Sequence, residues 1–189
     1  PNFASILELN GQNQTVTVTG SSPMGLILSG VVQNAMNSAT PAGLIKAGSS
    51  SLVLTAANTF AGGVQLNAGT LIIGAASTGS TAGTAVTSGP LGTGMLTIAA
   101  GTQILFVQTD QDNNQIGDYG LLVNGRVLVQ GEAANPVVFT SYTVDSNDQR
   151  VNGDWDGIIL QGDQPSSIAN AVIEYANIGL SVRDASTVT

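Results

Sequence analysis

Residues Ser51 to Gly74 read SLVLTAANTFAGGVQLNAGTLIIG and carry the clearest local pattern in the chain. It holds three short apolar runs, which Asn, Gly, Ala and Thr separate with neither a helical pattern nor a long loop between them. Runs of a few Leu, Val or Ile residues bounded by Gly and Asn are typical of β-strands. The stretch therefore predicts very short strands joined by frequent turns.

The same alternation of short runs and turn residues continues along the rest of the 189 residues. Residues 14–20, QTVTVTG, alternate strictly, with Val on one face and Thr on the other. The segment with the most helical appearance, SIANAVIEYANIGL at 167–180, also fits a period of two and is predicted to be strand. Thr, Ser and Asn are abundant at outward positions, which predicts a solvated, uncharged face; adherence to sugars or to identical neighbours is the alternative.

Two architectures accept strands this short, an antiparallel sandwich and a parallel β-helix. A sandwich favours strands of about five or six residues with charged edges, whereas the runs here are shorter and their edges carry no Lys. In a β-helix, coils of about 20–30 residues stack at roughly 4.8 Å, with Gly and Asn at the corners and branched side chains inside. We therefore predict an all-β, right-handed parallel β-helix (a solenoid) of about six to eight coils.

Charge is scarce and unevenly distributed. Charged residues make up 8% of the chain, against roughly 25% of a typical soluble domain, and the net charge is −8. Residues 1–109 contain one acid, Glu8, and one base, Lys46, whereas residues 110–189 contain all the other acids and three Arg. We predict one continuous stack in which nearly uncharged coils (1–109) precede acidic coils (110–189).

The composition excludes several classes of function. A chain this acidic does not suit nucleic acid or an anionic membrane as a partner; it suits cations, Ca²⁺ first, with plain solvation as the alternative. The absence of Cys and His excludes disulfides, thiolate or imidazole zinc sites and Ser–His or Cys–His mechanisms. No run of about 18 apolar residues is present, so we expect no membrane insertion by this segment. Because it starts at Pro1 without Met, we expect it to be a piece of a longer protein.

Residues Lys46 to Gly74 closely resemble the autotransporter-associated β-strand repeat. That repeat combines Lys-x-Gly, two alternating Leu, an Asn-Thr-Tyr/Phe step, a Gly-Gly pair and a final Gly-x-Leu-x-x-Gly. The matching residues are Lys46, Gly48, Leu52, Leu54, Asn58, Thr59, Phe60, Gly62, Gly63, Gly69, Leu71 and Gly74. The chain departs from the repeat at Ser50 and Ala56, where Gly is usual, and both replacements are small. The flanks extend the resemblance over roughly residues 6–104.

Residues 118–189 resemble a second group, the parallel β-helix modules of pectate-lyase-like surface proteins. The segments of that group occur here in order as GRVLVQG, NPVVFTS, an Asp/Asn-rich loop, WDGIIL and VIEYANIGLSV. Both resemblances imply a right-handed parallel β-helix on a secreted or surface-displayed bacterial passenger. They place the protein outside the cell or at its surface, and neither names a reaction.

The first candidate Ca²⁺ site lies in DQDNNQIGDYG at 110–120. Its candidate ligands are Asp110, Asp112, Asn114 and Asp118. They occupy positions 1, 3, 5 and 9 of a calcium loop, where alternating oxygen side chains can surround the ion. Position 6 is Gln115 instead of Gly, and position 12 is Leu121 instead of Glu, so the loop is an incomplete EF-hand. A solvated turn is the alternative.

The second candidate Ca²⁺ site lies in DSNDQRVNGDWD at 145–156, a loop rich in side chains that carry oxygen. A loop of this length between two coils needs a bound ion or an ion pair to order it. Its candidate ligands are Asp145, Asn147 and Asp154. Pairing of Arg150 with an acid is the alternative way to order this loop. Trp155, the single Trp, is predicted to cap the apolar edge at the base of the loop; stacking on a sugar ring is the alternative.

Asp154 and Asp156 have the spacing of a glycosidase pair. Residues i and i+2 of a strand point to one side about 6.5–7 Å apart, and hydrolysis uses two carboxylates about 5–9.5 Å apart. A lyase of the β-helix type would also need a Ca²⁺ cluster and a basic residue, and only Arg150 lies near these acids. We therefore predict that the chain is not an enzyme.

The function predicted from the sequence is structural. We expect a segment of a secreted or cell-surface passenger that forms a rigid stalk or fibre and associates with copies of itself, end to end or laterally. The alternatives are an adhesin module that binds a glycan or a host surface, and a polysaccharide lyase or hydrolase.

Overall fold

The computed structural model describes residues 1–36, 38–78, 86–123, 125–142, 150–161, 164–183 and 188–189. Within these residues the secondary structure consists of short strands, β1 to β18, and contains no helix. Every pairing between these strands is parallel. Two facing antiparallel layers are therefore excluded, and the predicted parallel β architecture is confirmed.

The strands form four sheets, and in each sheet they follow one another in chain order. The seven-stranded sheet contains β1 (Asn2–Phe3), β4 (Leu26–Leu28), β7 (Ser51–Leu54), β9 (Thr70–Ile73), β11 (Gln103–Val107), β14 (Val137–Tyr142) and β17 (Ala171–Ile173). The six-stranded sheet contains β3 (Gln14–Thr17), β6 (Leu44–Ala47), β8 (Val64–Leu66), β10 (Leu96–Ala99), β13 (Val127–Gln130) and β16 (Ser167–Ala169). The two smaller sheets contain β12 (Leu121–Val123), β15 (Trp155–Leu160) and β18 (Ala176–Val182), and β2 (Leu7–Leu9) with β5 (Val32–Asn34).

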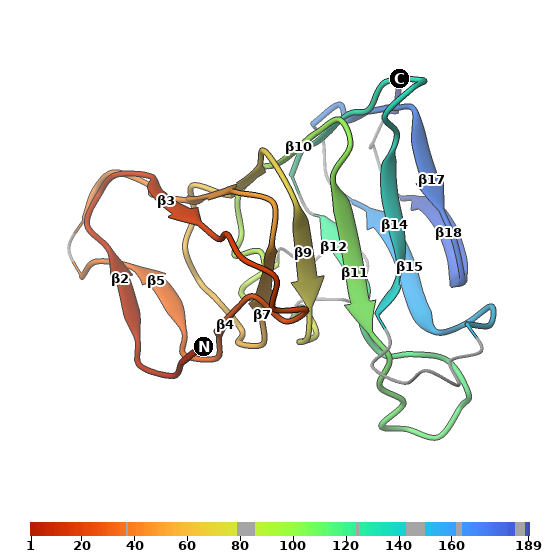
Figure 1. The fold of residues 1–189 in the computed structure, drawn as a ribbon, viewed down its shortest axis with the longest axis horizontal. Helices are drawn as coiled ribbons and strands as arrows, with labels where there is room; N and C mark the ends of the chain where they lie inside the picture. The colour runs from red at the N-terminus through yellow and green to blue at the C-terminus, as the bar shows by residue number, and fades with distance from the viewer. Residues whose placement is uncertain (37, 79–85, 124, 143–149, 162–163, 184–187) are drawn as a thin grey trace.

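A chain that returns to the same sheets once per turn forms a β-helix. Figure 1 shows the coils following one another along the long axis, from β2 and β5 near the N-terminus to β17 and β18 near the C-terminus. The seven-stranded sheet has one strand per coil, which agrees with the predicted number of coils. The charge boundary at residue 110 does not interrupt the stack, because β11 before it pairs with β14 after it.

The interior consists of side chains that stack on their counterparts in the next coil. Leu52 pairs in register with Leu71, Leu71 with Ile104, and Ile104 with Phe139. All four side chains are buried and belong to one core cluster. In-register stacking explains the short strands, because each strand needs only two or three inward side chains to extend a continuous core.

The segment with helical appearance, residues 167–180, is strand as predicted. It contains β16, β17 and the first part of β18. Single residues with positive φ join these strands: Asn170, between β16 and β17, has a φ of 47°, and Tyr175, between β17 and β18, has a φ of 61°. Left-handed single residues of this kind turn the chain sharply without a loop.

The outer face of the seven-stranded sheet differs from the solvated face that the sequence predicts. Val53 and Ile72 lie between inward-facing neighbours on β7 and β9, outside the core cluster, yet only 2% and 1% of their surface is exposed. The segment that connects β3 to β4 crosses these strands in Figure 1, and its Met24 reaches Tyr142 of β14, whose hydroxyl donates to the Met24 sulfur at 2.6 Å. The Ser50 hydroxyl donates to the Gly20 carbonyl in the same segment. This segment therefore buries the aliphatic outer positions.

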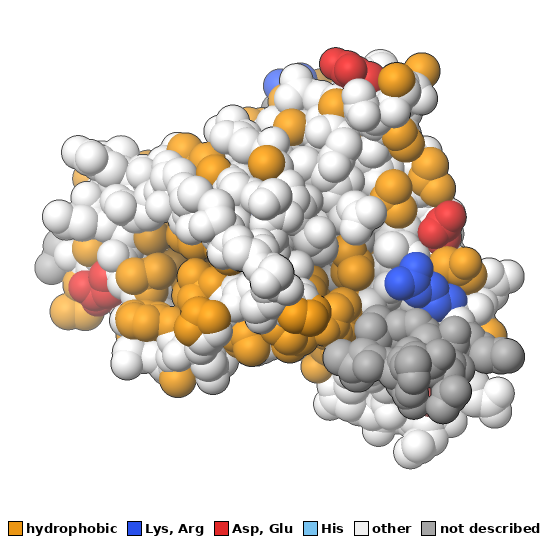
Figure 2. Space-filling view, in the orientation of Figure 1, with side chains coloured by type: hydrophobic (Ala, Val, Ile, Leu, Met, Phe, Trp, Pro, Cys, Tyr) orange, Lys and Arg blue, Asp and Glu red, His pale blue; other side chains and the backbone are white. Residues whose placement is uncertain are grey.

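Charged side chains are few on the face shown in Figure 2, and most of those visible lie toward the C-terminal coils. Hydrophobic side chains gather over the N-terminal and central coils of the same face. The charged residues, which are concentrated in the second part of the sequence, are therefore also concentrated at the C-terminal end of the stack on this face.

Gly63 occupies a corner where the backbone of one coil lies directly on the next. Its φ is +80°, and a Cβ atom at this position would lie 2.0 Å from the carbonyl oxygen of Met95. The same carbonyl accepts the ladder hydrogen bond from the Val64 N–H at 2.9 Å, so it cannot move aside without loss of that bond. Glycine is therefore required at this position.

We expect Gly63→Ala to lower the free energy of unfolding by about 1–3 kcal/mol, because it adds strain at positive φ and overlap with backbone. Gly125→Ala is the matched control, since a Cβ there would meet no atom within 4 Å, and we expect a change below about 0.5 kcal/mol. Urea denaturation followed by circular dichroism measures both. Equal stability of the two variants would contradict the close contact between coils.

Candidate functional site

The first acidic segment forms one loop between β11 and β12, at the lower right of Figure 1. The four predicted ligands lie in this loop, but their oxygen atoms already accept hydrogen bonds within it. The Asp110 carboxylate accepts from the N–H groups of Asn114 at 3.1 Å and Gln115 at 2.9 Å. The Asp112 carboxylate accepts from Asn114, at 3.2 Å from the backbone N–H and 3.0 Å from the side-chain amide. The side chains of the loop therefore hold its own backbone.

The second half of the same loop follows this pattern. The Asn114 side-chain oxygen accepts from the Ile116 N–H at 2.7 Å, and the Asp118 carboxylate accepts from the Gln111 N–H at 2.5 Å. Gln115 stands where a calcium loop has Gly, and its φ of 68° is in the left-handed region that glycine favours. The loop thus has the left-handed turn of a calcium loop at this position, with Gln in place of Gly.

Asp154 lies at the base of this loop, on the next coil. Only 1% of its surface is exposed, and its carboxylate accepts from the Gln108 side-chain amide at 3.1 Å and from the Val151 N–H at 3.2 Å. The Gly117 N–H donates to the Gly153 carbonyl at 2.7 Å, which fixes the loop against this coil. The structure therefore brings the two acidic segments together at one corner, with Asp154 enclosed between them.

The remaining predicted ligands, Asp145 and Asn147, lie outside the described residues. Among the residues that the structure describes, no three acidic side chains gather in a group that could hold a metal ion. Both calcium sites stay predictions. The hydrogen bonds within the first loop hold its backbone in the conformation described above.

Trp155 lies inside the core instead of at its edge. Its ring is fully buried and stacks on Phe106 of the preceding coil, with centroids 4.0 Å apart and planes 4° apart. Its indole N–H donates to the Glu174 carbonyl at 2.8 Å, on the following coil. The predictions that Trp155 caps the edge of the loop or stacks on a sugar are therefore both wrong, because an inward position on β15 places the ring between two coils.

Asp154 and Asp156 lie in different surroundings despite their spacing. Asp154 is enclosed beneath the acidic loop, whereas Asp156 is half-buried and lines a cavity on the outer face of the three-stranded sheet. A hydrolytic pair needs both carboxylates beside the substrate. The geometry therefore does not present these two acids as a pair.

The cavity has a volume of about 370 Å³. Its lining residues are Ala76, Ser77, Gln111, Asp118, Gly120, Leu121, Leu122, Asp156, Gly157 and Ile159. They come from the corner after β9, the acidic loop, and the outer face of β12 and β15. Sequence analysis missed this cavity because its walls are far apart in the chain and meet only through the stacking of three coils.

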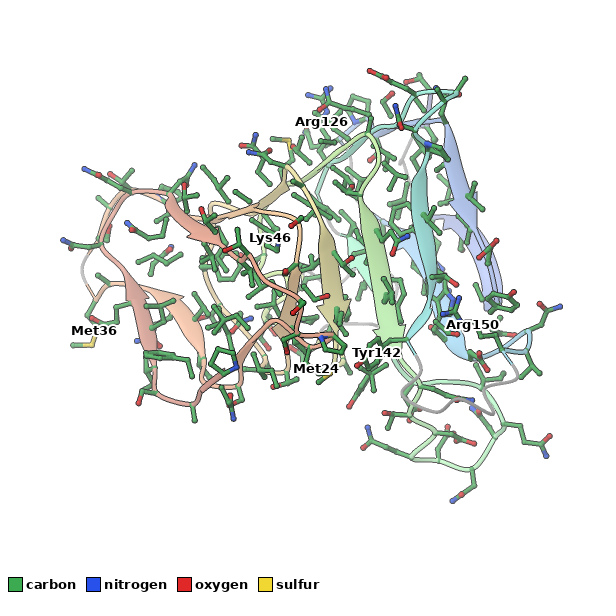
Figure 3. All side chains as sticks on the ribbon, viewed as in Figure 1. Met24, Met36, Lys46, Arg126, Tyr142 and Arg150 are labelled. Carbon is green, nitrogen blue, oxygen red and sulfur yellow. The ribbon has the colours of Figure 1, made fainter. Side chains whose placement is uncertain are left out.

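Lys46 is a buried base that the sequence identified only as a repeat residue. It is fully buried, at the centre of the N-terminal half in Figure 3, and its Nζ donates to the carbonyls of Ala47, Gly48 and Ala68 at 2.9, 2.8 and 3.0 Å. Burial lowers the pKa of this ammonium group below its ordinary value of 10.5. Lys46 lies two residues after the inward Leu44 on β6, so strand alternation alone places its side chain on the inward face.

Asn58 joins three successive coils from a fully buried position. Its side-chain oxygen accepts from the Val32 N–H at 2.7 Å, and its side-chain amide donates to the Pro90 carbonyl at 2.8 Å. Lys46 and Asn58 therefore serve the backbone of the stack and not a ligand.

Two family models match the chain. The passenger-associated-transport repeat matches residues 44–73, the segment that resembles the β-strand repeat in sequence. The pectate-lyase-like β-helix domain matches residues 81–179, just over half of the chain. The chain belongs to this pectate-lyase-like β-helix family. No curated protein and no solved structure matches it.

The pectate-lyase-like β-helix match confirms the second resemblance and begins earlier than the sequence analysis placed it, at residue 81 instead of 118. The two matches together confirm a passenger repeat followed by a β-helix module. Because the family is defined by a fold, the expectation that the chain is not an enzyme stays a prediction. No helix of a length and hydropathy that would cross a membrane occurs in the described part of the chain.

Proposed function

We propose that this segment is a rigid structural part of a secreted or cell-surface passenger protein, and that it serves as a stalk or fibre. The observation that supports this most strongly is the unbroken pairing of the seven-stranded sheet from β1 to β17, which runs through both family matches. A continuous core with parallel ladders on several sides resists bending, because any bend must break hydrogen bonds and open the core at once.

We further propose that such segments associate end to end. On β18, Leu180 and Val182 are 37% and 46% exposed, although their register partners Ile158 and Leu160 on the preceding coil are buried. These are inward positions that no further described coil covers. Where this segment stands alone, such exposed inward side chains are a template for a coil of another copy.

Analytical ultracentrifugation over a range of concentrations tests this association. We expect species larger than the monomer to grow with concentration, and we expect Leu180→Lys to suppress them by placing a charge in the contact. Leu128→Lys, on the outward face of β13, is the control and should associate like the parent protein. A parent protein that stays monomeric at high concentration would contradict end-to-end association.

A further inference from the structure

The cavity on the three-stranded sheet combines an apolar floor with an acidic wall. Leu122 and Ile159 pair in register on β12 and β15, and both line the cavity. Asp118 and Asp156 also line it, and no Lys or Arg is among the described lining residues. Its volume of about 370 Å³ lies in the range of small-molecule pockets, which is about 300–1,000 Å³.

A β-bulge lies beside Asp156, where β15 pairs with β18. Trp155 and Ile158 both face the core, so two residues, Asp156 and Gly157, lie between consecutive inward positions. The register between β15 and β18 shifts at Gly157 and Ile158, and Gly157 has a φ of +130°. Regular alternation would have turned Gly157 inward. Asp156 itself keeps the outward position next to the inward Trp155, and bulges are common beside functional sites.

The two carboxylates differ in the hydrogen bonds that they already accept. Asp118 accepts one hydrogen bond from the Gln111 N–H through one of its oxygens, which fixes the direction of the group. The Asp156 carboxylate has no hydrogen-bond partner or ion pair within the described part of the chain, although its backbone N–H is held by the Tyr119 carbonyl at 2.9 Å. A half-buried carboxylate without a partner attracts a cationic donor.

We propose that this cavity binds a primary ammonium group carried on a short carbon framework. The ammonium group donates to Asp156 and Asp118, and the carbon framework rests on Leu122 and Ile159. An alkylamine and an amino sugar both have this chemistry, whereas uronates and phosphates are repelled by the two carboxylates. The inference does not depend on the proposed structural role, because binding can occur on an isolated segment.

Titration of the full chain by two-dimensional NMR, in the presence of a chelator that removes divalent cations, tests the proposal. The probes are pentylamine and glucosamine, with pentanol, glucose and galacturonate as neutral and anionic counterparts. We expect saturable shifts around the cavity for at least one amine and not for its neutral counterpart. Saturation by pentylamine alone identifies an alkylamine site, and saturation by glucosamine alone identifies an amino-sugar site.

Asp156→Asn removes the negative charge with little change of shape, and we expect it to weaken amine binding about tenfold or more. Glu132→Gln, an exposed acid outside the cavity lining, removes the same charge elsewhere and should leave binding unchanged. Asp118→Asn is the second variant if Asp156→Asn does not fold. Failure of both amines to saturate, or equal weakening by the cavity variants and by Glu132→Gln, would overturn the proposal.

Discussion

Trp155→Ala is expected to lower the free energy of unfolding by about 3–5 kcal/mol. The substitution removes the largest fully buried side chain and leaves a cavity beside Phe106, whose stacked partner is lost. It also removes the donor to the Glu174 carbonyl. Because total stabilities of single domains are about 5–15 kcal/mol, we expect a large shift of the urea midpoint measured by circular dichroism.

Trp155→Phe is the matched variant. It keeps an aromatic ring against Phe106 and loses the indole donor, so we expect a smaller loss of about 1–2 kcal/mol. In the parent protein, the fluorescence of this single Trp should be shifted to short wavelength and should not respond to added sugars, because the ring is fully buried. A Trp155→Ala variant as stable as the parent protein would show that the ring lies at the surface.

Lys46→Met is expected to lower the free energy of unfolding by about 2–4 kcal/mol. Methionine keeps the apolar stem but removes the ammonium group that donates to three carbonyls at the corners of two coils. Relief from burying a charge offsets part of this loss. Arg126→Met, at an exposed base, removes the same charge without buried partners and should change stability by less than about 0.5 kcal/mol. Equal effects would contradict the buried position of Lys46.

The difference in the free energy of unfolding between the parent protein and Lys46→Met is expected to depend on pH. Burial lowers the Lys46 pKa in the folded state below 10.5, so between that lowered value and 10.5 the unfolded chain binds more protons than the folded chain. Stability contributed by this group therefore rises with pH through this window and is least below it. The stability of the parent protein relative to Lys46→Met should increase as the pH rises toward 10.5. A constant or falling difference would contradict a lowered pKa.

The sequence predicts the strands well because their signals are local. The runs at 51–54 and 70–73 are strands, since alternation and turn residues within a few positions determine them. The corners at Asn170 and Tyr175 were harder to see, because left-handed φ angles interrupt what resembles a helical period.

The side-chain environments were less predictable, because they depend on neighbours that are one or more coils away. Trp155 was assigned to an edge since its stacking partner, Phe106, belongs to the preceding coil. Val53 and Ile72 are outward residues that are buried by the segment before β4, which no local pattern indicates. The acidic loop was located correctly, but the direction of its carboxylates depends on backbone N–H groups that only a structure places.

The distance between spin labels on the outward face of the six-stranded sheet tests the stacked-coil architecture most directly. Thr15 is four register steps from Leu128 and five from Ser167, and the chain has no Cys to interfere with labelling. Pulsed electron paramagnetic resonance should give narrow distributions, with backbone sites about 19 Å apart for the first pair and about 24 Å for the second. Broad distributions, or a second distance no longer than the first, would contradict a rigid parallel β-helix.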